Sequence, residues 1–285
     1  MTSAAFSDLM TDTAMKSCVA AVPILLLLPA VLKAQEKTPG DPVRVFALNA
    51  ALGGITAGIA RAAQDESPWG AIVRGSAGGI VVFAGKSIAA RTRNGTIIGR
   101  PLAALGESEI RNASAGARLL DEFVIPYGPV RVYLTRDNWK PQPRLDLSTV
   151  GAATYFLMVK DGARFDPRRS FRYGAIVIAH SGLGDLQSAG VILLNPWNAE
   201  ALPWKNARGH ESVHLVQADF VSAVWNEPLE TWILSSLPSG KSIHRNFDFG
   251  VLNILWTAMN HLIPYGNRPW EQEAYLLTKG IRPPF

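Results

Sequence analysis

Gly209-His210-Glu211-Ser212-Val213-His214 is the stretch around which the chain is organised, because its two histidines stand four residues apart at the start of an expected helix. Residues four apart lie on one helical face, so both imidazoles can reach a single metal ion. Two histidine nitrogens and one carboxylate suit Zn²⁺ and leave a coordination position for water. Glu211 can accept a proton from that water. A chance match, with two surface histidines at a helix start, is the alternative.

The residues around the motif predict an amphipathic helix from about Arg208 to Trp225. Its apolar stripe, which we expect to pack on a core, consists of Val213, Val216, Phe220 and Val224. The adjacent stripe, at the edge of the buried face, consists of His210, His214 and Gln217. A ligand cluster on that stripe could line a cleft.

The order of elements around the motif resembles the gluzincin class of zinc metallopeptidases. An expected strand at 189–194 precedes the His210-Glu211-x-x-His214 helix, and a later helix carries Glu271-x-x-Ala274. The resemblance covers about Gly190 to Leu277. It implies a Zn²⁺ cofactor, a peptide or protein substrate, the metal ligands His210, His214 and Glu271, and Glu211 as general base. Tyr275 stands where the class usually has Asp or Asn, and Glu273 is a second candidate for the third ligand.

Other side chains compete for roles in such a site. The alternatives for a donor to a tetrahedral oxyanion are His244, His261, Tyr265 and Tyr275. Glu227 and Glu230 follow the first helix closely and rival Glu271 as a ligand, although Pro228 favours a helix-end surface position for Glu227. His180 ends an expected strand, where a structural role is the simpler interpretation.

Composition narrows the function classes. The 285 residues are 48% hydrophobic and only 18% charged, with a formal net charge of +5 and no block of basic residues. This pattern argues against a nucleic-acid partner and favours contact with a membrane or a membrane-protein complex. A single cysteine, Cys18, excludes a disulfide framework and a multi-cysteine metal site.

The first 34 residues resemble an export signal or a membrane anchor. Met15-Lys16 is a small basic region, Cys18 to Leu32 is apolar, and Leu32-Lys33-Ala34 is a passable cleavage site. We therefore expect an exported or cell-envelope protein that is membrane-associated. An uncleaved inner-membrane anchor is the alternative.

Residues 35–120 form an expected helical region rich in Gly and Ala. Gly54-x-x-x-Gly58 and Gly75-x-x-x-Gly79 predict a hairpin between Val43 and Ala90 whose two helices approach closely at these glycines. Such a hairpin is either a packed soluble pair or a membrane-associated one. Charged residues inside it, among them Lys86, shorten the uninterrupted apolar stretches.

Residues 121–285 are expected to combine a sheet with the zincin-like helices, which makes the fold class α+β. A period of two predicts a central antiparallel sheet of about five strands, near residues 130–135, 144–147, 154–160, 175–179 and 189–194. Asp161-Gly162 predicts a tight hairpin turn. The last strand is expected at the sheet edge, beside a peptide cleft.

The C-terminal helices are expected to continue from a break at Asn226-Glu227-Pro228. Asp248 to Leu262 is apolar on nearly every side, which predicts a deeply buried helix. Trp270 to Lys279 is the expected last helix. The whole pattern predicts a membrane-associated, zinc-dependent peptidase. A non-catalytic subunit that keeps a peptidase-like fold and docks on a membrane complex is the alternative, and Tyr275 is its main support.

Overall fold

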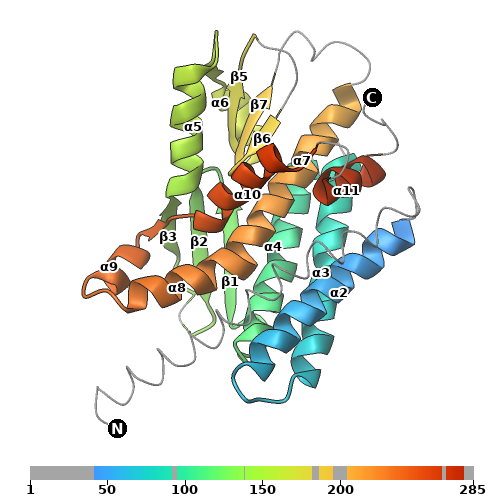
Figure 1. The fold of residues 1–285 in the computed structure, drawn as a ribbon, viewed down its shortest axis with the longest axis vertical. Helices are drawn as coiled ribbons and strands as arrows, with labels where there is room; N and C mark the ends of the chain where they lie inside the picture. Colours follow the sequence, from blue (N-terminus) through green and yellow to red (C-terminus); the bar gives the residue numbers. More distant parts are fainter. Residues whose placement is uncertain are drawn as a thin grey trace.

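The computed structural model describes residues 42–91, 95–137, 139–181, 186–194, 204–264 and 268–278, and it confirms a mixed α+β fold (Figure 1). The expected export signal or anchor at 1–34 lies outside these residues. In chain order the elements are α2 (Pro42–Ala62), α3 (Trp69–Arg91), α4 (Gly95–Ser114), β1 (Glu122–Tyr127), β2 (Val130–Thr135), β3 (Gln142–Asp146), α5 (Leu147–Val159), β4 (Arg164–Phe165), α6 (Pro167–Tyr173), β5 (Ile176–Ala179), β6 (Leu186–Ser188), β7 (Val191–Leu194), α7 (Trp204–Phe220), the π-helix η2 (Val221–Asn226), α8 (Glu227–Ser235), α9 (Gly240–His244), β8 (Phe247–Asp248), α10 (Val251–Leu262) and α11 (Pro269–Leu277).

Helices α2 and α3 form the predicted hairpin, with their backbones in contact at the predicted glycines. A Cβ atom added at Gly79 would overlap the carbonyl group of Asn49, and one at Gly75 would overlap that of Gly53. Gly54 and Gly58 lie against Ile72 on the same interface. Only a residue without a side chain allows so close an approach.

The opposite side of α3 packs on α4 in the same way. Gly78 abuts Gly106, and Gly85 abuts Gly99, so α3 is the middle helix of a three-helix layer. By length and composition, α2 and α3 are each apolar enough to cross a membrane, with mean hydropathies of 1.5 and 1.3. This is weak support for membrane association, because helices in a soluble core can have the same properties.

Two small sheets replace the single expected antiparallel sheet. The first has the strand order β1-β2-β3-β8, and the second has the order β4-β5-β7-β6. Each contains one parallel pair, β3 with β8 and β5 with β7. The expectation of β7 as an edge strand is wrong, since β7 lies between β5 and β6.

The expected strand at 154–160 is wrong, and helix α5 takes its place. The cause lies at Asp146, whose side chain accepts a hydrogen bond from the Thr149 amide and caps the helix. Asp146 is itself held by Arg131 at 2.7 Å. A fixed N-cap ends the strand and starts a helix, so the chain leaves the first sheet here.

Helices α7 and α8 form one helical run, with no break at Asn226-Glu227-Pro228. The π-helix η2 joins them and ends immediately before Glu227 and Pro228, so the wider π-turn lies where the proline has no amide hydrogen to donate. Two groups of η2 contact α10: Asn226 accepts from the Leu252 amide, and Ser222 meets the Asn253 side chain.

The expectation of a deeply buried helix at 248–262 is also wrong. Helix α10 starts at Val251 and exposes several apolar side chains, among them Ile254, Leu255 and Leu262. Its inward contacts come from Trp256, which stacks against Trp270 at a centroid distance of 4.5 Å, and from the buried Asn253.

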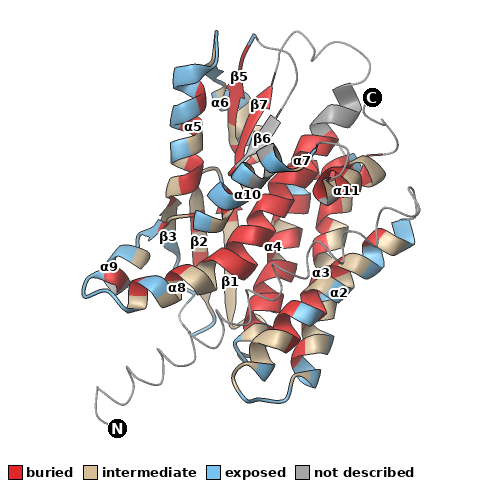
Figure 2. Cartoon of the chain, in the orientation of Figure 1, coloured by how far each residue is buried: buried red, intermediate tan, exposed pale blue. Residues whose placement is uncertain are grey.

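The main core lies between α3, α4, α7 and η2, where Figure 2 shows mostly buried residues. Its largest members include Ile110, Phe220 and Trp225. A second cluster joins α2, α3, α7 and α11 through Val45, Ala90, Val213, Ala274 and Leu277. The helices that carry the predicted ligands therefore rest directly on the glycine-rich hairpin.

Candidate metal centre

Helix α7 places His210 and His214 on one face and fixes their position against α3. Gly209 precedes them, and a Cβ atom there would overlap the carbonyl group of Ala90. Val213, between the histidines, is fully buried in the cluster shared with α11. The expected amphipathic character is wrong, since residues 209–226 are buried on every side. The two imidazoles lie within this buried region, with their ring centroids 4.5 Å apart.

Helix α11 brings Glu271 to both histidines. Glu271 Oε2 lies 3.0 Å from His210 Nε2 and 3.1 Å from His214 Nε2, and the two Nε2 atoms are 2.9 Å apart. All three side chains are buried. The three atoms form a nearly equilateral triangle of potential ligands.

This triangle fits a zinc ion. Ligand atoms held tetrahedrally at about 2.0–2.1 Å from zinc lie about 3.3 Å from one another. The separations of 2.9 to 3.1 Å need to open by only a few tenths of an ångström. One ion can therefore contact all three atoms.

Gln217, one turn further along α7, fixes the orientation of His214. Its Nε2 group donates to the Trp270 carbonyl and to Glu273 Oε2, both of which only accept. Its Oε1 atom therefore faces His214 Nδ1 at 2.7 Å, and that nitrogen must carry the proton. The neutral imidazole then keeps its lone pair on Nε2, the atom in the triangle.

Glu273 is not part of the triangle. It binds Lys86 Nζ of α3 at 3.0 Å and accepts from Asn49 Nδ2 of α2 at 2.7 Å. Burial alone would raise the pKa of Glu273, but the charge of Lys86 together with hydrogen bonds from Asn49, Gln217 and Lys86 lowers it. Between the two carboxylates that the sequence left as alternatives, the geometry favours Glu271 as ligand and gives Glu273 a supporting position.

The pKa values of the three side chains in the triangle favour the binding of a cation there. Burial lowers the pKa of His210, whereas the Glu271 carboxylate overcomes burial and raises the pKa of His214 to about 9. Burial would raise the pKa of Glu271, but the charge of His214 and the hydrogen bonds from both histidines lower it well below its usual range. In the metal-free protein, His214 therefore holds a proton that a metal would displace.

Two further residues border the triangle. Glu211 is buried, and its negative charge lies close enough to contribute to the raised pKa of His214. The Tyr275 ring lies beside His210, at a centroid distance of 4.4 Å. Tyr275 thus occupies the neighbourhood in which the resemblance leads us to expect Asp or Asn.

The remaining candidates lie elsewhere or outside the described residues. Glu227, Glu230 and His244 gather in a different cluster, around Arg144. His180 is buried at the end of β5. Tyr265 and the side chain of His261 lie outside the described part of the chain.

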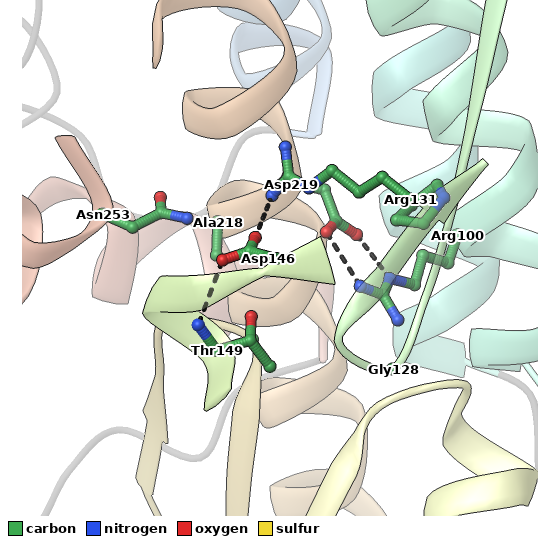
Figure 3. A pocket seen from close by; sticks show the side chains of 10 residues that line it. Arg100, Gly128, Arg131, Asp146, Thr149, Ala218, Asp219 and Asn253 are labelled. Atoms are coloured by element: carbon green, nitrogen blue, oxygen red, sulfur yellow. Dashed lines mark hydrogen bonds and ion pairs between the residues drawn. The ribbon is translucent and has the colours of Figure 1, made fainter. Parts of the chain in front are cut away.

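A small polar pocket lies one helical turn beyond His214 (Figure 3). Its lining includes Asp219, which forms a two-point ion pair with Arg100 at 2.5 and 2.9 Å, and the Arg131–Asp146 pair. Because these charges already neutralise one another, the pocket is better explained as part of the structural core than as a second ligand site.

No known protein family, no characterised protein and no solved structure matches this chain. The candidate centre therefore has to be judged on its own geometry. Sequence reasoning placed Gln217 on the stripe of the two histidines but gave no role to Lys86 and Asn49, which also support the centre. A signal for Lys86 did exist, since a lysine inside an otherwise apolar helix has to find a buried partner.

Proposed function

We propose that this chain is a membrane-associated, zinc-dependent peptidase, and the triangle of His210, His214 and Glu271 carries the proposal. The spacing of the three atoms suits one zinc ion, and the Gln217 hydrogen bond supports the tautomer that binds metal. The order of strand, His-Glu-x-x-His helix and glutamate helix also agrees with the gluzincin resemblance.

When bound, zinc would supply a Lewis acid that acidifies a water molecule and polarises a carbonyl group. His210, His214 and Glu271 would hold the ion. Glu211 would take the proton of the attacking water and deliver it to the departing amine. The buried surroundings of these side chains strengthen each electrostatic interaction. Peptide-bond hydrolysis is the reaction that this set of groups supports best.

Glu211→Gln in the full chain tests the proposal. The amide has the same shape but cannot accept a proton, so digestion of a mixed peptide library should fall by about 10²–10⁴-fold. Zinc content should stay near one ion per chain, because Glu211 is not a proposed ligand. Glu66→Gln, at the exposed α2–α3 turn, is the matched control and should change neither quantity. Equal cleavage by the Glu211→Gln and parent proteins would exclude Glu211 as the base.

A non-catalytic subunit with a peptidase-like fold is the second candidate, and the position of Tyr275 favours it. A tyrosine ring beside His210 cannot supply the carboxylate or amide oxygen that supports a ligand in the resembling class. The parent protein separates the two candidates. Zinc together with cleavage supports the peptidase, whereas a folded chain that cleaves no peptide in the library supports the docking subunit.

A further inference from the structure

The outer face of the α2–α3 hairpin is mostly apolar, with Arg44 half-exposed on the same helical stripe as Ala51 and Ile55. The exposed positions of the two helices are Pro42, Val43, Phe46, Ala47, Ala51, Ile55 and Ala62 on α2, and Trp69, Gly70, Val73, Ala77, Ile80 and Arg91 on α3. Arg91, the last residue of α3, is the only charged residue in this set. Val73 is 69% exposed and Trp69 is 72% exposed.

The inner face carries the polar groups of the same helices. Lys86 and Asn49 point to Glu273, and Arg74 pairs with Glu109 of α4 at 2.6 Å. A membrane helix normally turns its charges towards protein and its apolar side towards lipid. The hairpin follows this division: Lys86 and Arg74 face the protein, and the apolar residues face outward on the opposite side.

The neighbours of α3 argue against a hairpin that crosses the bilayer. Gly78, near the middle of α3, abuts Gly106 of α4. One half-turn further along α4, Ser108 accepts from the Val124 amide of β1, an edge strand. A crossing hairpin would carry this small sheet to the depth of the hydrocarbon, whereas sheets span a bilayer only as closed barrels.

We propose that the outer face of α2 and α3 rests on one leaflet of a lipid bilayer, with both helix axes parallel to the membrane surface. Helices bound in this way bury their apolar side about 5–10 Å into the boundary between headgroups and acyl chains. Trp69 is an aromatic residue of the kind enriched at that boundary. The inference rests on the membrane association proposed above and is independent of the metal chemistry.

The chain ahead of α2 is consistent with a lipid occupant. The apolar run from Cys18 to Leu32 ends nine residues before Pro42. If the run stays in the membrane as an anchor, a nine-residue connection reaches at most about 30 Å, which keeps α2 near the bilayer. Because the outer face has almost no charge, its binding should depend little on salt or on anionic lipid.

Single cysteines in the full chain, with Cys18 changed to Ala, test this arrangement. Ile55→Cys and Val73→Cys lie on the outer face, Asp65→Cys lies in the α2–α3 turn, and Met158→Cys on α5 is an equally apolar control that is 80% exposed. Each thiol receives an environment-sensitive dye, and phosphatidylcholine vesicles are added. Dye emission at positions 55 and 73 should shift to the blue, and emission at 158 should not.

The side of the vesicle from which each thiol can be labelled completes the test. A membrane-impermeant thiol reagent should reach positions 65 and 158 from the same side of the vesicle. Labelling from opposite sides would mean that the hairpin crosses the membrane, so the orientation would be wrong while membrane association stands. No shift at 55 and 73, or a shift that appears without vesicles as protein concentration rises, would overturn lipid as the occupant. Circular dichroism of every variant reports on folding, and its zinc content reports separately on the metal site.

Discussion

Two clusters of histidine and carboxylate lie along the α7–η2–α8 helical run, and they differ in where their positive charge comes from. His210, His214 and Glu271 form the first, and Glu230, His244 and Asp248 form the second. Both are buried, and in both the potential ligand atoms lie within 4.8 Å of one another. Spacing alone therefore does not distinguish them.

Arginine already occupies the second cluster. Arg144 Nη1 lies 3.1 Å from His244 Nε2 and 3.5 Å from Asp248 Oδ1. An arginine can only donate, so it engages the lone pair that a metal would need. Glu230 accepts from the amides of Phe249 and Gly250, which leaves that carboxylate committed to the backbone.

In the first cluster, the charges that lower the pKa of Glu271 come from the two histidines themselves. Unlike arginine, an imidazolium can release its proton near neutral pH and become a ligand. We therefore propose that two properties together distinguish a metal site from a structural ion-pair cluster: suitable distances between the ligand atoms, and cationic groups that a metal can displace.

The largest expected contrast between the clusters is in zinc content. His214→Ala should reduce bound zinc from about one ion per chain to none, because two protein ligands hold zinc poorly. His244→Ala, the matched change in the second cluster, should leave zinc unchanged. Metal analysis of both purified variants measures the difference. Loss of zinc in the His244 variant, with retention in the His214 variant, would exchange the roles of the two clusters.

A change at Arg144 should affect the second cluster and lower the stability of the protein without changing its zinc content. Arg144→Met leaves the half-buried carboxylate of Glu227 and the buried carboxylate of Asp248 short of a counter-charge, and losing one partner of a buried pair typically costs about 3–5 kcal/mol of unfolding free energy. The pKa of Glu227, which Arg111 and Arg144 hold at about 2 against the effect of burial, should rise in the variant. Denaturant unfolding measures the stability, and zinc content should not change. An unaltered free energy of unfolding would contradict the assigned structural role.

The free energy of unfolding of the metal-free protein should depend on pH through the histidines of the first cluster. The pKa of His214 is raised from 6.5 to about 9, so its stabilising charge is complete below pH 6.5 and lost as pH rises through 9. The free energy of unfolding should fall over this window, by up to about 3 kcal/mol. His210, whose pKa is lowered, acts below pH 6.5 instead. In His214→Gln, unfolding measured at the same pH values should show no such fall.

The smallest expected effect concerns the hydrogen bond to His214. Gln217→Met removes the acceptor that fixes the imidazole, and losses of this kind typically weaken metal binding about 10–100-fold. Thr231→Val removes a contact of 3.1 Å to His244 and serves as the control, with no effect on zinc affinity. Competition with a zinc chelator measures both affinities. Equal affinities in the two variants would show that Gln217 does not orient the ligand.

Local signals in the sequence predicted the parts of the fold that depend on short spacing. The histidine pair follows from one helical turn, and the hairpin contact follows from glycines four apart. The sheet was harder to predict, because strand pairing joins residues far apart in the chain. Asp146 shows the difficulty: its capping role starts α5 where an apolar run had suggested a strand.

The supporting residues of the candidate centre could not be derived from the sequence for a similar reason. Glu273 meets Lys86 across 187 positions and Asn49 across 224. No periodicity within one helix predicts such a contact. The exposed apolar face of α10 also shows that composition sets how apolar a helix is, while the tertiary fold decides which side is covered.

The π-helix η2 adds one residue to the helical run between the two clusters. A π-turn accommodates this residue in a wider turn, so the α-turns on either side keep nearly the same phase. Deleting one residue from Val221–Asn226 would restore a uniform α-helix and leave α7 and α8 in nearly the same relative orientation. The loss would fall on the contacts of the π-turn with α10, where Asn226 accepts from the Leu252 amide and Ser222 meets the Asn253 side chain. The inserted residue thus changes which side chains face α10 and leaves the flanking helices where they are.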